Sequence, residues 1–303
     1  MKLFIYLIIG AGSFFLVACG GGSSSTSTSA STPDTPVTPT ITSFTSWSAT
    51  TANVPVAMTG GFSSSVDLVG NISQSDSSGS ATFTRDASNN YTLINSTASA
   101  GNSAIFSSAL SDTLTSSFNG ATTTSLNKAQ TTISIFANPS NYAFNYQTYG
   151  TWGSYGNATG TSFALSDGSA SPASAIPTVG ALTYTGGSVG YYVDVNKVAY
   201  VTNSNLIVNL TFDSRKASFV SSTTGIQGAP AGNTVPNANL DLTGTITYVA
   251  GTNYFTGTVT TTNGMTGNIN GEYYGPGLNE LGGTYAVYGV GLGTMVGSFG
   301  SKR

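Results

Sequence analysis

The sequence lacks histidine, and it has one cysteine and few charges. Only 6% of its 303 residues are Asp, Glu, Lys or Arg, against about 25% in a typical soluble protein. A Ser-His-Asp triad, a Cys-His dyad, a His-liganded zinc site and a His-ligated haem are therefore excluded within this chain. The net charge of −3 and the absence of a basic run argue against nucleic acid as a partner.

Residues 1–18 have the layout of a secretory signal peptide. A basic Lys2 precedes an apolar run that is too short for a permanent transmembrane helix, and small residues then lead to Cys19. The run Leu16-Val17-Ala18-Cys19 resembles the lipobox of bacterial lipoproteins, in which the peptide is cut before the cysteine and that cysteine is acylated, with palmitate as the expected chain. We therefore expect Cys19 to be lipidated and to anchor the protein in a membrane; the alternative is a plain secreted protein.

The segment that follows, residues 20–40, consists almost entirely of Gly, Ser, Thr and Pro. Such a composition cannot form a core, and a flexible chain of this length spans roughly 25 Å. We interpret residues 19–40 as a lipidated linker. By analogy with lipoprotein sorting in enteric bacteria, Gly20 after the cysteine favours the outer membrane of a Gram-negative bacterium.

Beyond residue 40 the pattern is all-β and antiparallel, with no convincing helical periodicity. A shift to small residues and prolines around residues 167–177 indicates a domain boundary, which we place between residues 171 and 172. In the first domain, residues 41–171, we expect an antiparallel handle sheet. Its predicted strands are 42–49, 54–59, 66–73, 80–86, 90–96, 103–110, 131–137 and 142–152.

In the second domain, residues 172–303, apolar and polar residues alternate along eight segments. This period indicates strands that are packed on one face and wet on the other. Glycines recur on the apolar face, where they let strands coil and leave room for large neighbours, as in a small barrel. The other face carries Thr, Asn and Ser, which predicts a soluble eight-stranded antiparallel β-barrel. The segments begin near residues 180, 199, 216, 239, 254, 265, 280 and 293.

The C-terminal run NGEYYGPGLNELGGTYAVYGVGLGTMVGSFGSKR resembles the signature of transferrin-binding protein B lobes. The upstream segments ALTYTGGSVGYYVD, LIVNLTFD, LDLTGTITY and NYFTGTV resemble strands of the same barrel, and YQTYGTW resembles the end of the preceding handle domain. The signature residues themselves are interpreted as structural. The matching positions are Gly271, Tyr273, Tyr274, Gly275, Pro276, Glu280, Gly282, Gly283, Phe299, Gly300, Lys302 and Arg303.

This resemblance implies a surface-exposed lipoprotein that binds solutes in iron acquisition, often after export by a surface lipoprotein assembly modulator. Its relatives bind transferrin, haemoglobin, haem or complement factor H. The chain has one handle and one barrel, whereas transferrin-binding protein B has two such lobes, so its size is closer to that of single-lobe haem and haemoglobin binders. Without histidine, haem could be held only by Tyr, by Met or without ligation.

An aromatic cluster between residues 142 and 155 supplies the candidate ligand contacts. Tyrosines among Ser, Gly and Asn offer large contact areas at low entropic cost, and Tyr149 and Tyr155 lie outside the alternation of their neighbours. Glu272 and Glu280, the only glutamates, are read as structural and not as an acid/base pair. Asp76 and Asp86 lack the spaced carboxylates of a calcium loop. We expect no metal and no cofactor.

The sequence thus predicts a non-enzymatic, surface-exposed lipoprotein of the outer membrane, because no nucleophile has a base to activate it. Its candidate partners are the membrane, through Cys19, a host protein or a haem or iron carrier, and an export modulator. The alternative is a structural or adhesion lipoprotein without a soluble ligand.

Overall fold

The computed structural model describes the chain from Val56 onward, with gaps. The described residues are 56–58, 60–77, 81–85, 91–95, 103–106, 113–115, 123–128, 132–137, 143–154, 158–228 and 233–303. The expected signal peptide, Cys19, the linker, the predicted strand 42–49 and Tyr155 lie outside these residues. Among the residues that are described, no helix is long and apolar enough to cross a membrane.

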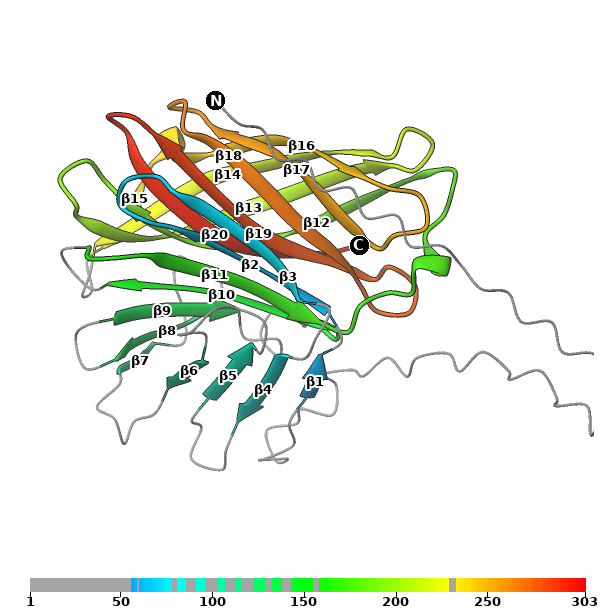
Figure 1. Cartoon of the computed structure of the whole chain (residues 1–303), viewed down its shortest axis with the longest axis horizontal. Helices are drawn as coiled ribbons and strands as arrows, with labels where there is room; N and C mark the ends of the chain where they lie inside the picture. The colour runs from blue at the N-terminus through cyan, green and yellow to red at the C-terminus, as the bar shows by residue number, and fades with distance from the viewer. Residues whose placement is uncertain are drawn as a thin grey trace, which may run out of the picture. The chain divides into compact units, whose positions relative to one another are not determined.

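Eight antiparallel strands close into a barrel in the C-terminal part of the chain (Figure 1). The barrel order is β13-β12-β20-β19-β18-β17-β16-β14, and pairing of β13 with β14 closes it, as predicted. A two-residue strand, β15 (Val235–Pro236), adds to β14. The barrel strands are β12 (Ala181–Val193), β13 (Ala199–Thr211), β14 (Lys216–Gly228), β16 (Leu242–Tyr248), β17 (Tyr254–Thr261), β18 (Thr266–Tyr274), β19 (Glu280–Gly289) and β20 (Gly293–Lys302).

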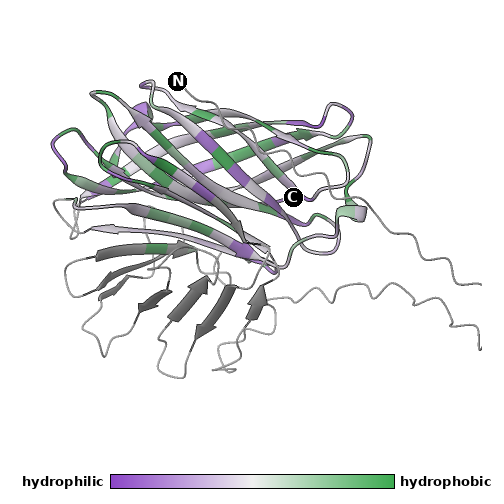
Figure 2. Ribbon diagram, viewed as in Figure 1, coloured by the Kyte–Doolittle hydropathy of each residue, from purple (hydrophilic) through white to green (hydrophobic). Residues whose placement is uncertain are grey.

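Aromatic rings fill the barrel interior. Phe219 meets Phe299 edge to face with ring centroids 5.0 Å apart, and Phe255 packs on Tyr273 at 5.9 Å. Hydrophobic and hydrophilic residues alternate along the strands in Figure 2, and the outward positions of β16 and β17 are mainly threonines. An inward glycine makes room for one of the rings, because a Cβ at Gly297 would overlap the side chain of Tyr285. Gly297 therefore acts as the sequence predicted.

The handle forms two antiparallel sheets, where the sequence had suggested one. One has four strands in the order β1-β4-β5-β6, and the other has seven in the order β3-β2-β11-β10-β9-β8-β7. The first sheet contains β1 (Val56–Met58), β4 (Ala81–Arg85), β5 (Tyr91–Asn95) and β6 (Ser103–Phe106). The second contains β2 (Gly60–Val66), β3 (Ile72–Ser77), β7 (Thr113–Thr115), β8 (Thr123–Lys128), β9 (Thr132–Ala137), β10 (Gln147–Ser154) and β11 (Ser162–Gly168).

Two of the predicted handle strands were wrong in their limits. The segment 66–73 spans the turn between β2 and β3, because Asp67 caps that turn instead of continuing the strand. The segment 142–152 begins too early, since Ala143 has a left-handed backbone (φ 54°) and β10 starts only at Gln147. The alternation of Phe144 and Tyr146 with their neighbours therefore belongs to a bend and not to a strand.

The larger handle sheet packs on the outside of the barrel. β2, β10 and β11 contact β19 and β20, so these two barrel strands are buried on both faces. A second hydrophobic cluster fills this interface, and it includes Val66 and Tyr149 from the handle and Val189, Ala286 and Val296 from the barrel. The connection from β11 to β12 holds a short 3-10 turn, η3 (Ala173–Ala175), and the predicted boundary at residues 171/172 falls within this connection.

Candidate binding surface

The predicted ligand contact Tyr149 is an interior packing residue. Its ring is fully buried, lies against Gly300 of the barrel and meets Phe144 edge to face at 6.0 Å. In this position it is not available to a ligand in solution, because the larger handle sheet covers it. Its break in the local alternation arises from the bend before β10. The second predicted contact, Tyr155, follows β10 directly and lies outside the described residues.

The two glutamates are buried at the interface between handle and barrel. Glu280, at the start of β19, accepts hydrogen bonds from the backbone amides of Asn145 (2.5 Å) and Tyr146 (3.1 Å). Burial raises the pKa of Glu280 to about 7, although these amides and the nearby Lys302 lower it. Glu272, on β18, lies against Gly60 and accepts a bond from Asn253 Nδ2 (3.4 Å). Both residues therefore join handle to barrel, whereas the sequence suggested one outward carboxylate and one contact at a turn or barrel end; the difference arises because the handle covers this face of the barrel.

One end of the molecule is formed by hairpin turns from both the handle and the barrel, which we call the hairpin rim. It consists of the β2–β3 turn (67–71), residues 158–161, the β12–β13 turn (194–198) and the β19–β20 turn (290–292). Contacts hold these turns together: the Ala158 amide donates to the Lys197 carbonyl at 2.8 Å, and the Tyr192 hydroxyl donates to the Leu292 carbonyl at 2.9 Å. Gly70 packs on the ring of Tyr288.

Two of the rim turns are built in the same way, each around an aspartate. Oδ1 of Asp67 accepts from the amides of Val69 (3.0 Å) and Asn71 (2.9 Å). Oδ1 of Asp194 accepts from the amides of Asn196 (2.9 Å) and Val198 (2.8 Å). The fourth residue of each turn has a left-handed backbone, with φ 89° in the β2–β3 turn and 63° in the β12–β13 turn. The aspartate side chains thus fix both turns before any partner arrives.

The hydrogen bonds at Asp67 also shift the pKa of its carboxyl group. Burial alone would raise the pKa of this carboxyl, but the bonds from Asn71, Val69 and Gly70 outweigh it and lower the pKa. The carboxylate therefore stays ionised and keeps its turn closed well into the acidic range. A pattern of Asp followed four residues later by Asn or Val could have marked these turns in the sequence.

Each of the three complete rim hairpins exposes a valine at its tip. The exposed fractions of the side chains are 71% for Val69, 58% for Val195 and 85% for Val290. Single exposed apolar residues are normal, but three on neighbouring fixed turns form an apolar surface framed by Asp67, Asp194 and Lys197. Such a surface can bury apolar contact area against a partner at little cost in ordering, because its turns are already fixed.

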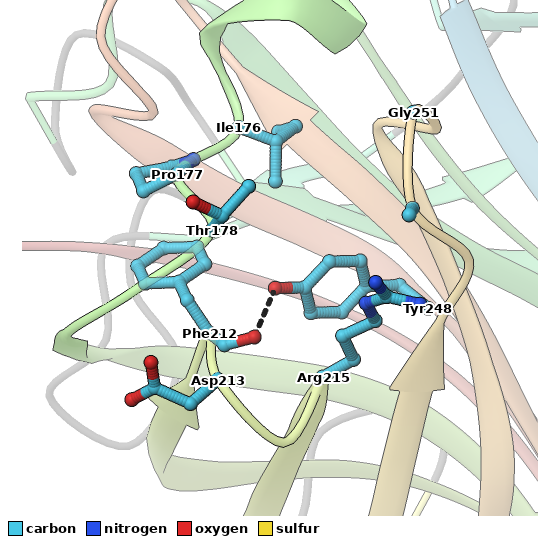
Figure 3. A pocket seen from close by; sticks show the side chains of 9 residues that line it. Ile176, Pro177, Thr178, Phe212, Asp213, Arg215, Tyr248 and Gly251 are labelled. Carbon is cyan, nitrogen blue, oxygen red and sulfur yellow. Dashed lines mark hydrogen bonds between the residues drawn. The ribbon is translucent and has the colours of Figure 1, made fainter.

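A small pocket lies at the opposite end of the barrel (Figure 3). It has a volume of about 80 Å³ and lies between the residues before β12, the β13–β14 turn and the β16–β17 turn. Tyr248 forms part of its wall and donates a hydrogen bond to the Phe212 carbonyl at 3.4 Å. This volume is well below the roughly 300–1,000 Å³ of small-molecule sites. Among the described residues, no group of three or more Cys, Asp or Glu is placed to hold a metal ion.

The arrangement defines a class: a small barrel filled by its own side chains, with a β-sheet domain packed on its outer face. Residues 176–303 match the family of C-lobe and N-lobe β-barrels of transferrin-binding protein B. This match of the barrel region confirms the resemblance seen in the C-terminal signature. A comparison with curated proteins finds no match.

Solved structures of low sequence identity are similar to this chain. A variant of transferrin-binding protein B from Haemophilus parasuis matches with 18% identity and a TM-score of 0.44, over 79% of this chain and 44% of its own. The Neisseria meningitidis serogroup B protein matches with 17% identity and a TM-score of 0.44, over 80% of this chain and 43% of its own. A protein described as a surface lipoprotein matches with 13% identity and a TM-score of 0.44, over 80% of this chain and 98% of its own. The chain spans less than half the length of the first two proteins.

Proposed function

We propose that this protein is a non-enzymatic lipoprotein, anchored through Cys19 and exposed at the surface of a Gram-negative outer membrane, that binds a host protein through the hairpin rim. The observation that carries the proposal is the set of three exposed valines on fixed turns. The match of residues 176–303 to the barrels of transferrin-binding protein B supports it.

The filled barrel favours a large partner over a small solute. Rings such as Phe219, Phe255 and Phe299 occupy the space in which other small barrels hold a ligand. A partner must therefore bind to the outside, where hairpin tips are accessible. A host protein that carries iron or haem fits this requirement, and transferrin is one candidate because the relatives are named for it.

The first experiment uses a chain beginning at Gly20 as bait, which keeps the whole compact unit Pro39–Arg303. Serum proteins, haemoglobin and haem are offered separately, and binding to at least one of the protein samples is expected at micromolar concentration. If none binds, the alternative of a structural or adhesion lipoprotein, whose Ser- and Thr-rich handle has no soluble ligand, takes the place of this proposal.

A matched pair of variants then tests the rim itself. Val290→Asp places a charge in the apolar surface, and it should weaken binding about tenfold or more because a valine side chain contributes about 1.5 kcal/mol when buried. Val249→Asp makes the same change at an exposed position in the β16–β17 turn, at the opposite end of the barrel, and should leave affinity unchanged. Equal affinities for both variants would remove the rim from the binding site.

The anchor is tested by fatty-acid labelling in cells. Cys19→Ser should abolish incorporation of labelled palmitate, because the chain has no other thiol. Continued labelling of the variant would overturn the lipobox assignment. Protease treatment of intact cells, with and without a surface lipoprotein assembly modulator as the proposed exporter, distinguishes a surface position from a periplasmic one.

A further inference from the structure

Basic side chains gather at the end of the barrel opposite the hairpin rim, which we call the basic end. It comprises the β13–β14 turn (212–215), the β16–β17 turn (249–253), the start of β14 and the C-terminus. Four of the eight Lys and Arg residues of the chain lie here, and all four are exposed. They are Arg215, Lys216, Lys302 and Arg303.

Few acidic groups offset these cations. Asp213 is the one exposed acid among the described side chains of the basic end, whereas Asp167, Glu272 and Glu280, the last of which lies near Lys302, are buried there. The other end has the reverse balance, with Asp67, Asp194 and Asp241 against Lys197. The described part of the molecule is therefore polarised along the barrel, although the net charge of the chain is −3.

The four cations follow an arc of adjacent strands. β14, β13, β12 and β20 are neighbours in the barrel, and Lys216 and Lys302 stand at the same end of the first and last of them. Three strand spacings across the sheet and four residues along it separate these two residues, because the register places Lys302 level with Val220, and the distance over the barrel surface is roughly 20 Å. A broad, shallow arc of this kind suits an extended anionic surface better than a single bound anion.

Exposed apolar tips lie beside the arc. Val179, just before β12, is 69% exposed, and Val249, in the β16–β17 turn, is 64% exposed. Between them lies the small pocket, with Arg215 next to the ring of Tyr248 (Figure 3). Proteins that bind at the interface of an anionic bilayer combine basic side chains, which contact the phosphate groups, with exposed apolar side chains, which enter the interface.

The chain also enters the described structure at this end. β2 begins at Gly60, which packs against Glu272 near the end of β18, and then runs toward the rim, where Gly70 packs on Tyr288. The last described residues before β2 are those of β1, which starts at Val56. The larger handle sheet therefore has its first strand starting at the basic end.

We propose that the basic end binds the anionic headgroups of a lipid bilayer and thereby turns the hairpin rim away from the membrane. The binding surface stands on the charges and exposed valines alone, and the resulting orientation rests on the proposed anchor at Cys19. Each of the four cations is expected to add about a fivefold factor to membrane partitioning at low salt.

The test uses the unlipidated chain beginning at Gly20 and co-flotation with vesicles of phosphatidylcholine alone or with added phosphatidylglycerol. Binding is expected only with phosphatidylglycerol, and it should be lost at about 1 M salt, where the screening length falls to about 3 Å. The double variant Arg215→Gln/Lys216→Gln should lower partitioning about 25-fold. The control Lys197→Gln removes one cation from the rim and should leave partitioning unchanged.

Several outcomes would overturn the proposal: no difference between the two vesicle types, binding that survives high salt, or an equal loss with Lys197→Gln. Circular dichroism of each variant identifies misfolding, and the second double variant Lys302→Gln/Arg303→Gln gives an independent reading at the other end of the arc. Because the chain used carries no lipid, failure of the anchor would appear in the labelling experiment and not here.

Discussion

Asp167, on β11, is a carboxyl group in a place that should destabilise the protein at neutral pH. The side chain is fully buried, and within the described part of the chain neither of its oxygens has a hydrogen-bond partner. Its neighbours across the sheet are Gly61 on β2 and Thr148 on β10. Burial raises the pKa of Asp167 from its usual 3.8 to about 8.

The sign of the effect on stability follows from these two pKa values. Below pH 3.8 the carboxyl of Asp167 is protonated in both the folded and the unfolded chain, and its ionisation costs nothing. As the pH rises, the unfolded chain loses this proton first, so stability falls by about 1.4 kcal/mol per pH unit until the folded form ionises near pH 8. At pH 7 the accumulated loss is about 4 kcal/mol.

Asp167→Asn removes this loss, because an amide of the same shape does not ionise. The protonated acid and the amide both leave polar atoms buried, so that cost is similar in the two proteins. We expect the variant to be more stable than wild type by about 4 kcal/mol at pH 7 and by less than about 1 kcal/mol at pH 4. The melting temperature should rise by about 10 °C at pH 7.

Thermal and urea unfolding of the chain from Gly20, measured at several pH values between 4 and 8, provides the assay. Asp213→Asn, at an exposed position, is the matched control and should change stability little. A difference between Asp167→Asn and wild type that does not grow with pH would refute the reasoning. A destabilised variant would show that Asp167 is ionised and paired in the folded protein.

Two further predictions concern the barrel and its contact with the handle. Gly297→Ala should lower the unfolding free energy by about 1–3 kcal/mol, because the added Cβ would overlap the ring of Tyr285. The control Gly228→Ala places its Cβ in open space and should be tolerated. Equal melting temperatures for the two variants would contradict this prediction. The stability of Glu280→Gln relative to wild type should increase as the pH rises from 5 to 7. The reason is that the carboxyl of Glu280 has a pKa of about 7 in the folded protein, so the unfolded chain loses this proton first and wild type is destabilised as the pH rises. A difference in urea unfolding free energy that does not change with pH would contradict this.

The barrel could be predicted from the sequence because most of its strands have one face exposed to solvent. Along β17, Phe255 and Val259 are buried while Thr256 and Thr258 are exposed, and that period of two is visible without a structure. Five strands begin at the predicted residues, including β13 at Ala199. β16 begins at Leu242, three residues after the start predicted near 239, because residues 238–240 form a 3-10 turn before it.

The handle was harder to predict because its strands are covered differently. β11, Ser162–Gly168, is almost wholly buried, so Ser, Ala and Asp in its sequence show no polar face. The end of this strand was therefore read as the start of a domain boundary. The exposed valines of the rim also escaped prediction, since exposure of Val69 or Val290 depends on which turns come together at one end of the molecule.

The C-terminal signature itself is explained by the contact between handle and barrel. Gln147 of β10 donates to the carbonyls of Leu281 (3.2 Å) and Ser301 (3.1 Å), and a Cβ at Gly282 would overlap its amide. Tyr149 packs on Gly300 in the same way, and the Tyr274 hydroxyl donates to the carbonyl of Ser166 at 3.3 Å.

Several signature residues of the barrel are therefore explained by the handle sheet that lies against β19 and β20. Glycine at 282 and 300 weakens an isolated strand, so its presence there implies the close approach of another sheet. The family match covers the barrel alone, yet these residues indicate the handle as well. The signature thus describes a docking surface within the molecule, and residues that contact a partner must be sought among the turns at its ends.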